Sequence, residues 1–154
     1  MLSDFIHNQV LIIAACTWIL TQAIKVVVIL VQEKRLDWNY MIASGGMPSA
    51  HTATVCSLAT SIAMTEGMGS TYFSIAVILA IIVMYDAAGV RQSVGQHSAF
   101  LNRLLKEISL KSTAVEREED FREFIGHTPF QVLIGALLGI AITWLWLFIR
   151  SLLA

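Results

Sequence analysis

The chain has 154 residues, of which 56% are hydrophobic and only 14% are charged, and its formal net charge is −1. A soluble domain of this length carries about 25% charged residues, so the composition excludes an ordinary soluble protein and indicates several membrane-spanning helices. A net charge near zero gives no basic surface for nucleic acid, and no nucleic-acid partner is expected. We therefore expect an all-α, polytopic membrane bundle in which residues 1–154 form a single integral membrane domain.

Four apolar segments follow one another along the chain, each near the ~20 residues that cross a ~30 Å hydrocarbon core. We predict membrane spans over about residues 9–31, 48–66, 72–90 and 130–149. The second segment is rich in Ala, Ser and Thr, so it would insert poorly alone, and we expect it inside the bundle. Its Ala53, Ser57 and Ser61 form a stripe of small residues. Gly135 and Gly139 form another in the fourth segment, and such stripes permit close contact between helices.

The polar segments between the spans predict the topology. Residues 91–126 form a long polar excursion in which apolar residues recur at the helical period from Phe100 to Ile108. We expect there an amphipathic helix that lies on the membrane surface or caps the bundle. The loops after the first and third spans carry most of the basic residues, whereas the opposite side has only Arg150. The positive-inside rule then places both polar loops in the cytoplasm.

Four polar residues fall near the face of the predicted bundle that carries these loops. Lys25 lies six residues before the end of the first span, which is about 9 Å below the interface. Asp86 lies four residues before the end of the third span. His51 is three residues into the second span, and His127 immediately precedes the fourth. The four side chains thus lie at similar depths in the predicted membrane, although hydropathy alone does not require this. Their common depth indicates a functional site.

Both prolines lie where an apolar segment begins. Pro48 belongs to Gly-Gly-Met-Pro-Ser-Ala-His, residues 45–51, and Pro129 follows Gly-His-Thr, residues 126–128. Proline is favoured at the first position of a helix, where free N–H groups and the helix dipole make an anion site. Two such helix starts, each with an imidazole, predict a pocket for a phosphate-like group that needs two proton-transfer or nucleophilic partners.

Each of these side chains also has a purely structural interpretation. Lys25 can snorkel to the interface, and Asp86 can form a structural ion pair with Arg91 or with Lys25. His51 can be a satisfied core histidine. His127 can be a polar residue at a helix start, with Thr128 as the N-cap.

Helical spacing adds a geometric prediction for the fourth span. His127, Gln131, Gly135 and Gly139 recur every four residues and therefore share one face of a helix. Gln131 can then hydrogen-bond an imidazole one turn back, and the glycines let another helix approach that face. A nucleophilic histidine needs such a partner, because one ring nitrogen must be fixed for the other to attack.

These motifs resemble those of the superfamily of type 2 phosphatidic acid phosphatases and vanadium haloperoxidases. Its signatures are a Lys with an Arg several residues on, a Pro-Ser-Gly-His, and an Arg followed by a His-x-x-x-Asp. Lys25 and Arg35 resemble the first, with a longer spacing, and residues 48–51, Pro-Ser-Ala-His, resemble the second. His127 and Gln131 resemble the third, with an amide where an acid is expected.

The resemblance is to the divergent bacterial and plant subgroup in particular. Residues 44–51 and 85–91 carry that subgroup's pattern, and with Gly95, Leu101 and Asn102 the similarity covers roughly residues 20–140. The resemblance implies an integral protein of the bacterial cytoplasmic membrane, and the positive-inside rule places the polar loops and the site at its cytoplasmic face. It also implies membrane lipids and a phosphorylated lipid as partners.

The resemblance further implies metal-independent hydrolysis of a lipid phosphate or pyrophosphate, with no cofactor. His127 would attack phosphorus and form a phosphohistidine, and His51 would protonate the leaving oxygen. Asp86 would supply the charge that Gln131 lacks if the third span packs beside the fourth. The groups expected to hold the phosphate oxygens are Lys25, Arg35, Ser49, Gly46 and Arg91, the last in place of the third signature's arginine.

Two other functions stay open at this point. The amide at Gln131 is compatible with a non-catalytic module that binds a phosphorylated lipid, or a partner, through the same pocket. The intramembrane Lys25 and Asp86 are compatible with a small transporter, although no paired broken helices are present in the pattern. The superfamily core has more helices than this chain offers, so we expect either a homodimer or a minimal bundle.

Overall fold

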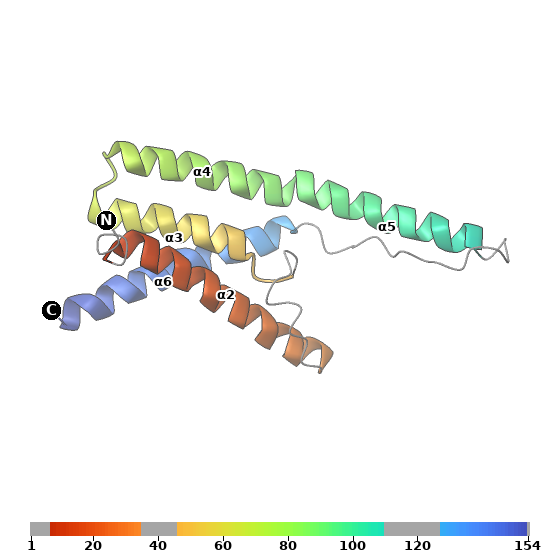
Figure 1. Cartoon of the computed structure of the whole chain (residues 1–154), viewed down its shortest axis with the longest axis horizontal. Helices are drawn as coiled ribbons and strands as arrows, with labels where there is room; N and C mark the ends of the chain where they lie inside the picture. The colour runs from red at the N-terminus through yellow and green to blue at the C-terminus, as the bar shows by residue number, and fades with distance from the viewer. Residues whose placement is uncertain (1–6, 35–45, 110–126, 154) are drawn as a thin grey trace.

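The computed structural model describes residues 7–34, 46–109 and 127–153, and within these ranges the chain is helical, with no strand (Figure 1). The helices of this described part are α2 (Gln9–Glu33), α3 (Ala50–Thr65), α4 (Thr71–Ala88), α5 (Val90–Ser109) and α6 (Pro129–Leu153). The predicted fold class, an all-α membrane bundle, is confirmed.

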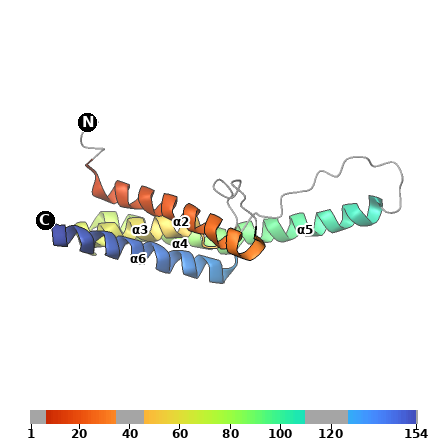
Figure 2. The same cartoon turned by 90° about the horizontal axis from the view of Figure 1, so that it is seen from below.

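Four of these helices form the bundle and alternate in direction, as two perpendicular views show (Figures 1 and 2). The central helix is α3, which packs against α2, α4 and α6, while α6 also contacts α2 and α4. α2 begins and α6 ends at one end of the bundle. At the other end α3 and α6 begin and α4 ends, and this second end carries His51 and His127.

Three helical stretches of the described chain are long and apolar enough to cross a membrane: Gln9–Gln32, Thr71–Leu104 and Pro129–Leu153. They contain the first, third and fourth predicted spans. α3 is shorter than the predicted span 48–66. Its 16 residues extend only about 24 Å, which is less than the ~30 Å thickness of the hydrocarbon core. It is the most enclosed by neighbours of the four, in accord with the expectation that this segment lies inside the bundle.

Capping side chains decide where the first three helices begin. In each case a side-chain oxygen accepts a hydrogen bond from the backbone N–H three residues on, and the caps are Asn8, Ser49 and Ser70. Because Ser49 caps α3, Pro48 precedes the helix and does not occupy its first position, which corrects the prediction for that proline. Pro129 is the first residue of α6, as predicted.

A close backbone contact joins α3 and α6 on the two stripes of small residues. A Cβ atom on Gly135 would lie 2.6 Å from the carbonyl oxygen of Ser49 and 3.2 Å from the Cβ of Thr52. A Cβ on Gly139 would overlap the backbone of Ala53. Only glycine leaves room for this approach, so the predicted role of both glycines is confirmed.

Three hydroxyl groups from three helices meet further along the same interface. Thr17 Oγ1 of α2 lies 2.9 Å from Ser57 Oγ of α3, which lies 2.8 Å from Thr143 Oγ1 of α6. Thr143 also donates to the carbonyl oxygen of Gly139 at 2.9 Å. All three side chains are fully buried, and buried hydroxyls in a membrane bundle need such partners. The cluster fixes the faces that α2 and α6 turn toward α3.

α5 continues from α4 and projects beyond the other helices (Figures 1 and 2). The predicted amphipathic segment from Phe100 to Ile108 is part of this longer helix, which already begins at Val90. The first part of the predicted polar excursion is therefore helical, and residues 110–126 lie outside the described ranges. The expectation that this helix caps the bundle is wrong, because α5 points away from it.

The glycine contact generates a stability prediction. Gly139→Ala places a methyl group against the backbone of Ala53, so the free energy of unfolding should fall by about 1–3 kcal/mol through overpacking. Gly69→Ala is the matched control, because a Cβ at Gly69 meets nothing within 4 Å. Thermal unfolding of the two purified variants measures the difference. Equal melting temperatures would contradict the close contact.

Candidate functional site

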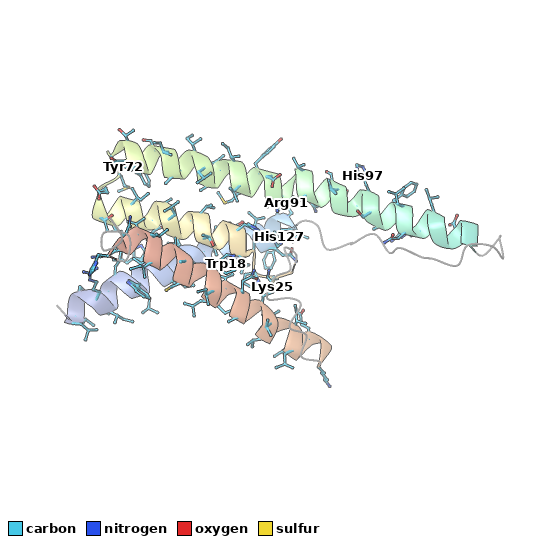
Figure 3. The ribbon with its side chains drawn as sticks, viewed as in Figure 1. Trp18, Lys25, Tyr72, Arg91, His97 and His127 are labelled. Atoms are coloured by element: carbon cyan, nitrogen blue, oxygen red, sulfur yellow. The ribbon has the colours of Figure 1, made fainter. Side chains whose placement is uncertain are left out.

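A small cavity, partly open to the surroundings, lies where α3 and α6 begin and α4 ends. Its lining residues are His51, Val83, Asp86, Ala87, Arg91 and His127. Four of these were predicted as site residues from the sequence, and they come from α3, α4, α5 and the segment before α6. Figure 3 shows Arg91 and His127 in this part of the bundle, with Lys25 on the side of α2.

The His127 ring is buried and oriented. The residue is 2% exposed, and its backbone N–H donates to the carbonyl oxygen of Ala87 at 3.2 Å, which ties this segment to the end of α4. Its Nδ1 lies 3.3 Å from Gln131 Oε1. Because an amide oxygen only accepts, this bond places the ring proton on Nδ1. Nε2 is then the unprotonated nitrogen, and it is buried without a hydrogen-bond partner among the described residues.

Thr128 and Gln131 form a capping box at the start of α6. The Gln131 N–H donates to Thr128 Oγ1 at 3.3 Å, and the Thr128 N–H donates to Gln131 Oε1 at 3.1 Å. The same Oε1 accepts from His127, so one amide both caps the helix and orients the imidazole. Helical spacing predicts only the second role, whereas the box is readable in the local motif Thr-Pro-Phe-Gln.

Asp86 and Arg91 form an ion pair at the wall of the cavity, with Arg91 Nε 2.5 Å from Asp86 Oδ2. Their side chains are 38% and 43% exposed, so the pair is open on one side. Lys25 and Arg91 are the two predicted partners of Asp86, and the structure shows the pair with Arg91. That Asp86 also stabilises a positive charge on His127 stays a prediction. His51, the second residue of α3, is exposed beside this pair.

Lys25 lies inside the bundle. It is 1% exposed, so the interpretation that it snorkels to the interface is wrong. A Cβ on Gly46 would lie 3.4 Å from Lys25 Cδ, and Gly46 has a φ of +86°. Glycine adopts this left-handed conformation without strain, so Gly46 lets the segment before α3 run along the lysine stem. The structure thus brings together residues of the first and second predicted motifs.

Ser49, another predicted phosphate-binding residue, does not line the cavity, and neither do Lys25 and Gly46. Ser49 is fully buried between α3 and α6, and its Oγ lies 3.0 Å from Thr52 Oγ1 while capping α3. Arg35 lies outside the described residues. Within the described ranges, no three His, Cys, Asp or Glu side chains form a group that could hold a metal ion.

Burial lowers the pKa of His127 below its ordinary value of 6.5. The hydrogen bond to Gln131 raises this pKa, and the nearby charges of Lys25, His51 and Arg91 lower it again. The net direction is downward, so the ring is neutral at neutral pH. An oxyanion in the cavity would therefore face a neutral Nε2 lone pair, the guanidinium of Arg91 and a second imidazole.

Comparison with known proteins identifies the lineage of this arrangement. The model of the Divergent PAP2 family matches residues 6–142. The chain belongs to this family. It is also 32% identical over 149 residues to the uncharacterized membrane protein YuiD of Bacillus subtilis (strain 168). The alignment covers 91% of this chain and 94% of YuiD. No solved structure matches the chain.

The family and the helices together establish the setting of the site. The match to the Divergent PAP2 family confirms the predicted resemblance, and its range contains both cavity histidines, Gln131 and Lys25. With three helices able to cross a bilayer and a relative named as a membrane protein, this member of the family is an integral membrane protein.

The lowered pKa of His127 generates a prediction for stability against pH. Since the unfolded chain binds this proton more tightly, the stability contributed by the neutral ring is complete above about pH 6.5 and is lost as pH falls toward the lower folded-state pKa. Thermal unfolding between about pH 7.5 and about pH 5 should show a larger loss for the native protein than for His127→Gln. Identical pH slopes in the two proteins would contradict it.

Proposed function

We propose that this protein is a membrane-embedded, metal-independent phosphatase that hydrolyses a lipid phosphate or pyrophosphate through a phosphohistidine on His127. One observation carries the proposal: His127 is buried at the cavity wall with Nδ1 held by Gln131 and Nε2 left without a partner among the described residues. A nucleophilic imidazole needs this arrangement, because the fixed tautomer directs the free lone pair. Membership of the Divergent PAP2 family supports it.

The proposed reaction has two steps. His127 Nε2 attacks phosphorus, the bond from phosphorus to the leaving oxygen breaks, and protonated His51 gives its proton to that oxygen. Water then attacks the phosphohistidine, His51 takes a proton from it, and the bond between phosphorus and nitrogen breaks. Arg91 stabilises the negative charge on the transferring phosphoryl group in both steps. One water is consumed, and the products are phosphate and an alcohol from a lipid phosphate, or phosphate and a lipid monophosphate from a lipid pyrophosphate.

The position of the cavity supports a lipid as the carrier of the phosphate. The cavity lies at the end of α4, and Val83 and Ala87 give it an apolar wall beside its charged groups. A headgroup phosphate meets both kinds of surface at the membrane interface. The excess of basic residues in the loops supports the cytoplasmic side.

A second candidate function is non-catalytic binding of a phosphorylated lipid in the same cavity. The observation that favours it is the amide of Gln131, which orients the His127 ring but carries no charge to stabilise the imidazolium that forms during attack. In this alternative the same groups hold the phosphate, and no phosphohistidine forms.

His127→Ala tests the nucleophile. The purified native protein, given a lipid phosphate with a labelled phosphorus and a chelator in place of metal, should release phosphate and carry the label on histidine in an alkaline quench. Vanadate should inhibit by mimicking five-coordinate phosphorus. His127→Ala should lose the label and slow turnover by about 10³-fold or more.

His7→Ala is the matched control, because this exposed histidine precedes α2 at the opposite end of the bundle. It should retain both the label and the turnover. Full turnover in His127→Ala would eliminate the proposed nucleophile, while lipid phosphate binding by the native protein with no labelled histidine would establish the second candidate.

Gln131→Glu tests the missing charge. Glutamate retains an acceptor for the Thr128 N–H and for His127 Nδ1, and adds a negative charge beside the developing imidazolium. Turnover should rise by about tenfold or more. Gln131→Ala should lower turnover, because the ring loses its partner. Unchanged turnover in Gln131→Glu would mean that another group, such as Asp86, already supplies the charge.

A further inference from the structure

α5 presents an apolar face to its surroundings beyond the end of the bundle. Its exposed apolar residues are Val90, Val94, Phe100, Leu101 and Leu104, with Val90 56% and Phe100 61% exposed. At 100° per residue these five side chains fall within an arc of about 120°, which also contains two exposed polar residues, Ser93 and His97. The opposite face holds the buried Gly95 and Asn102. The helix is therefore amphipathic, with its apolar side outward.

The length of α4 and α5 together prevents both from lying in one hydrocarbon core. The helical stretch Thr71–Leu104 has 34 residues and extends about 51 Å, whereas the core measures ~30 Å. α4 alone, with 18 residues, extends about 27 Å. If α4 crosses the membrane, α5 lies outside the hydrocarbon core. If α5 also continued straight on from α4, its apolar face would be in water. A mainly apolar exposed face of this kind indicates a contact surface.

The joint between the two helices is Gly89. Its φ of −109° and ψ of −82° lie outside helical values, and an added Cβ would be 2.9 Å from the carbonyl oxygen of Tyr85. Ile82 and Tyr85, in the last turns of α4, are exposed, and we expect exposed side chains of this membrane-spanning helix to meet lipid. The apolar face of α5 begins at Val90, directly after the joint, so the surface that meets lipid continues across it.

Charge and the width of the apolar face indicate the partner. The sequence of α5 contains Arg91, Arg103 and Lys106 against a single acid, Glu107. Basic residues beside a broad apolar arc are typical of helices that bind an anionic lipid surface. A two-stranded seam between copies would bury a narrower stripe and would leave Phe100, on its flank, in water.

We propose that α5 lies on an anionic membrane surface, turning at Gly89 and inserting its apolar face at the boundary between headgroups and acyl chains. Arg91 stands in the first turn of α5 and pairs with Asp86 across this joint, so the lipid contact also positions the guanidinium at the cavity. The docking itself does not rest on the proposed phosphatase activity.

The experiment uses the whole protein in nanodiscs, with Cys16→Ser and Cys56→Ala, and a nitroxide at Leu101→Cys. The matched label is at Gln96→Cys, which is also exposed on α5 but about 140° away around the helix. In discs of phosphatidylglycerol, the label at position 101 should be reached by dissolved oxygen and shielded from a water-soluble nickel complex. The label at position 96 should show the reverse, and the contrast should shrink in phosphatidylcholine.

Two outcomes would overturn the proposal. One is equal access of the nickel complex to both labels in anionic discs, which would leave α5 in water. The other is a label at position 101 that is shielded from both reagents and broadened by spin–spin coupling, which would show that a second copy covers the face.

A charge variant tests the lipid specificity separately. Arg103→Gln removes one basic residue from α5 and should weaken the docked population in anionic discs by about fivefold. Arg150→Gln, at the far end of α6, is the control and should leave the docked population unchanged. An equal effect of the two variants would contradict recognition of anionic lipid by α5.

Discussion

The backbone contact between α3 and α6 brings the two histidines of the site together. Lipid chains are as apolar as most helix faces, so burial of apolar surface does not hold membrane helices together, and close contact with interhelical hydrogen bonds must do so. Gly135 and Gly139 allow that contact, and the hydroxyl of Ser57 links α3 to both α2 and α6. With the two helices joined in this way, their starts stand side by side, and the imidazoles that precede or begin them share one cavity.

The site then follows from how each polar group finds a place at that end of the bundle. Arg91 neutralises Asp86, and the carbonyl of Ala87 and the amide of Gln131 hold the His127 segment. These bonds leave His127 Nε2 buried and without a hydrogen-bond partner among the described residues, in a residue that lines the cavity. The chain's membership of the Divergent PAP2 family accords with the phosphate chemistry proposed for this cavity, and the amide of Gln131 orients the His127 ring without adding a charge.

The sequence predicts those features that depend on spacing within one helix. It does not predict features that depend on contacts between segments distant in the chain. The bond between His127 and Gln131 and the role of the two glycines follow from a four-residue repeat, so both are correct. Lys25 shows the limit, because the same position in a span can snorkel or be buried, and only the neighbouring helices and Gly46 settle which. α3 begins after the cap Ser49 and not at the preceding proline. α5 is longer than its apolar repeat predicts, because the polar residues before the repeat are also helical.

The direction of α3 and α6 has an electrostatic consequence. Their contacts advance in step along both chains, from Ser49 beside Gly135 to Ala53 beside Gly139 and Ser57 beside Thr143, so the two helices run parallel. Antiparallel neighbours cancel each other's macrodipoles, but parallel ones place two positive poles together, each equivalent to roughly half an elementary charge. The close contact at Gly135 and Gly139 brings these two positive poles near one another, while α4 ends beside them and adds one negative pole. A negatively charged group between the two positive poles would relieve their mutual repulsion, so binding of the proposed phosphate would also strengthen the packing of α3 against α6.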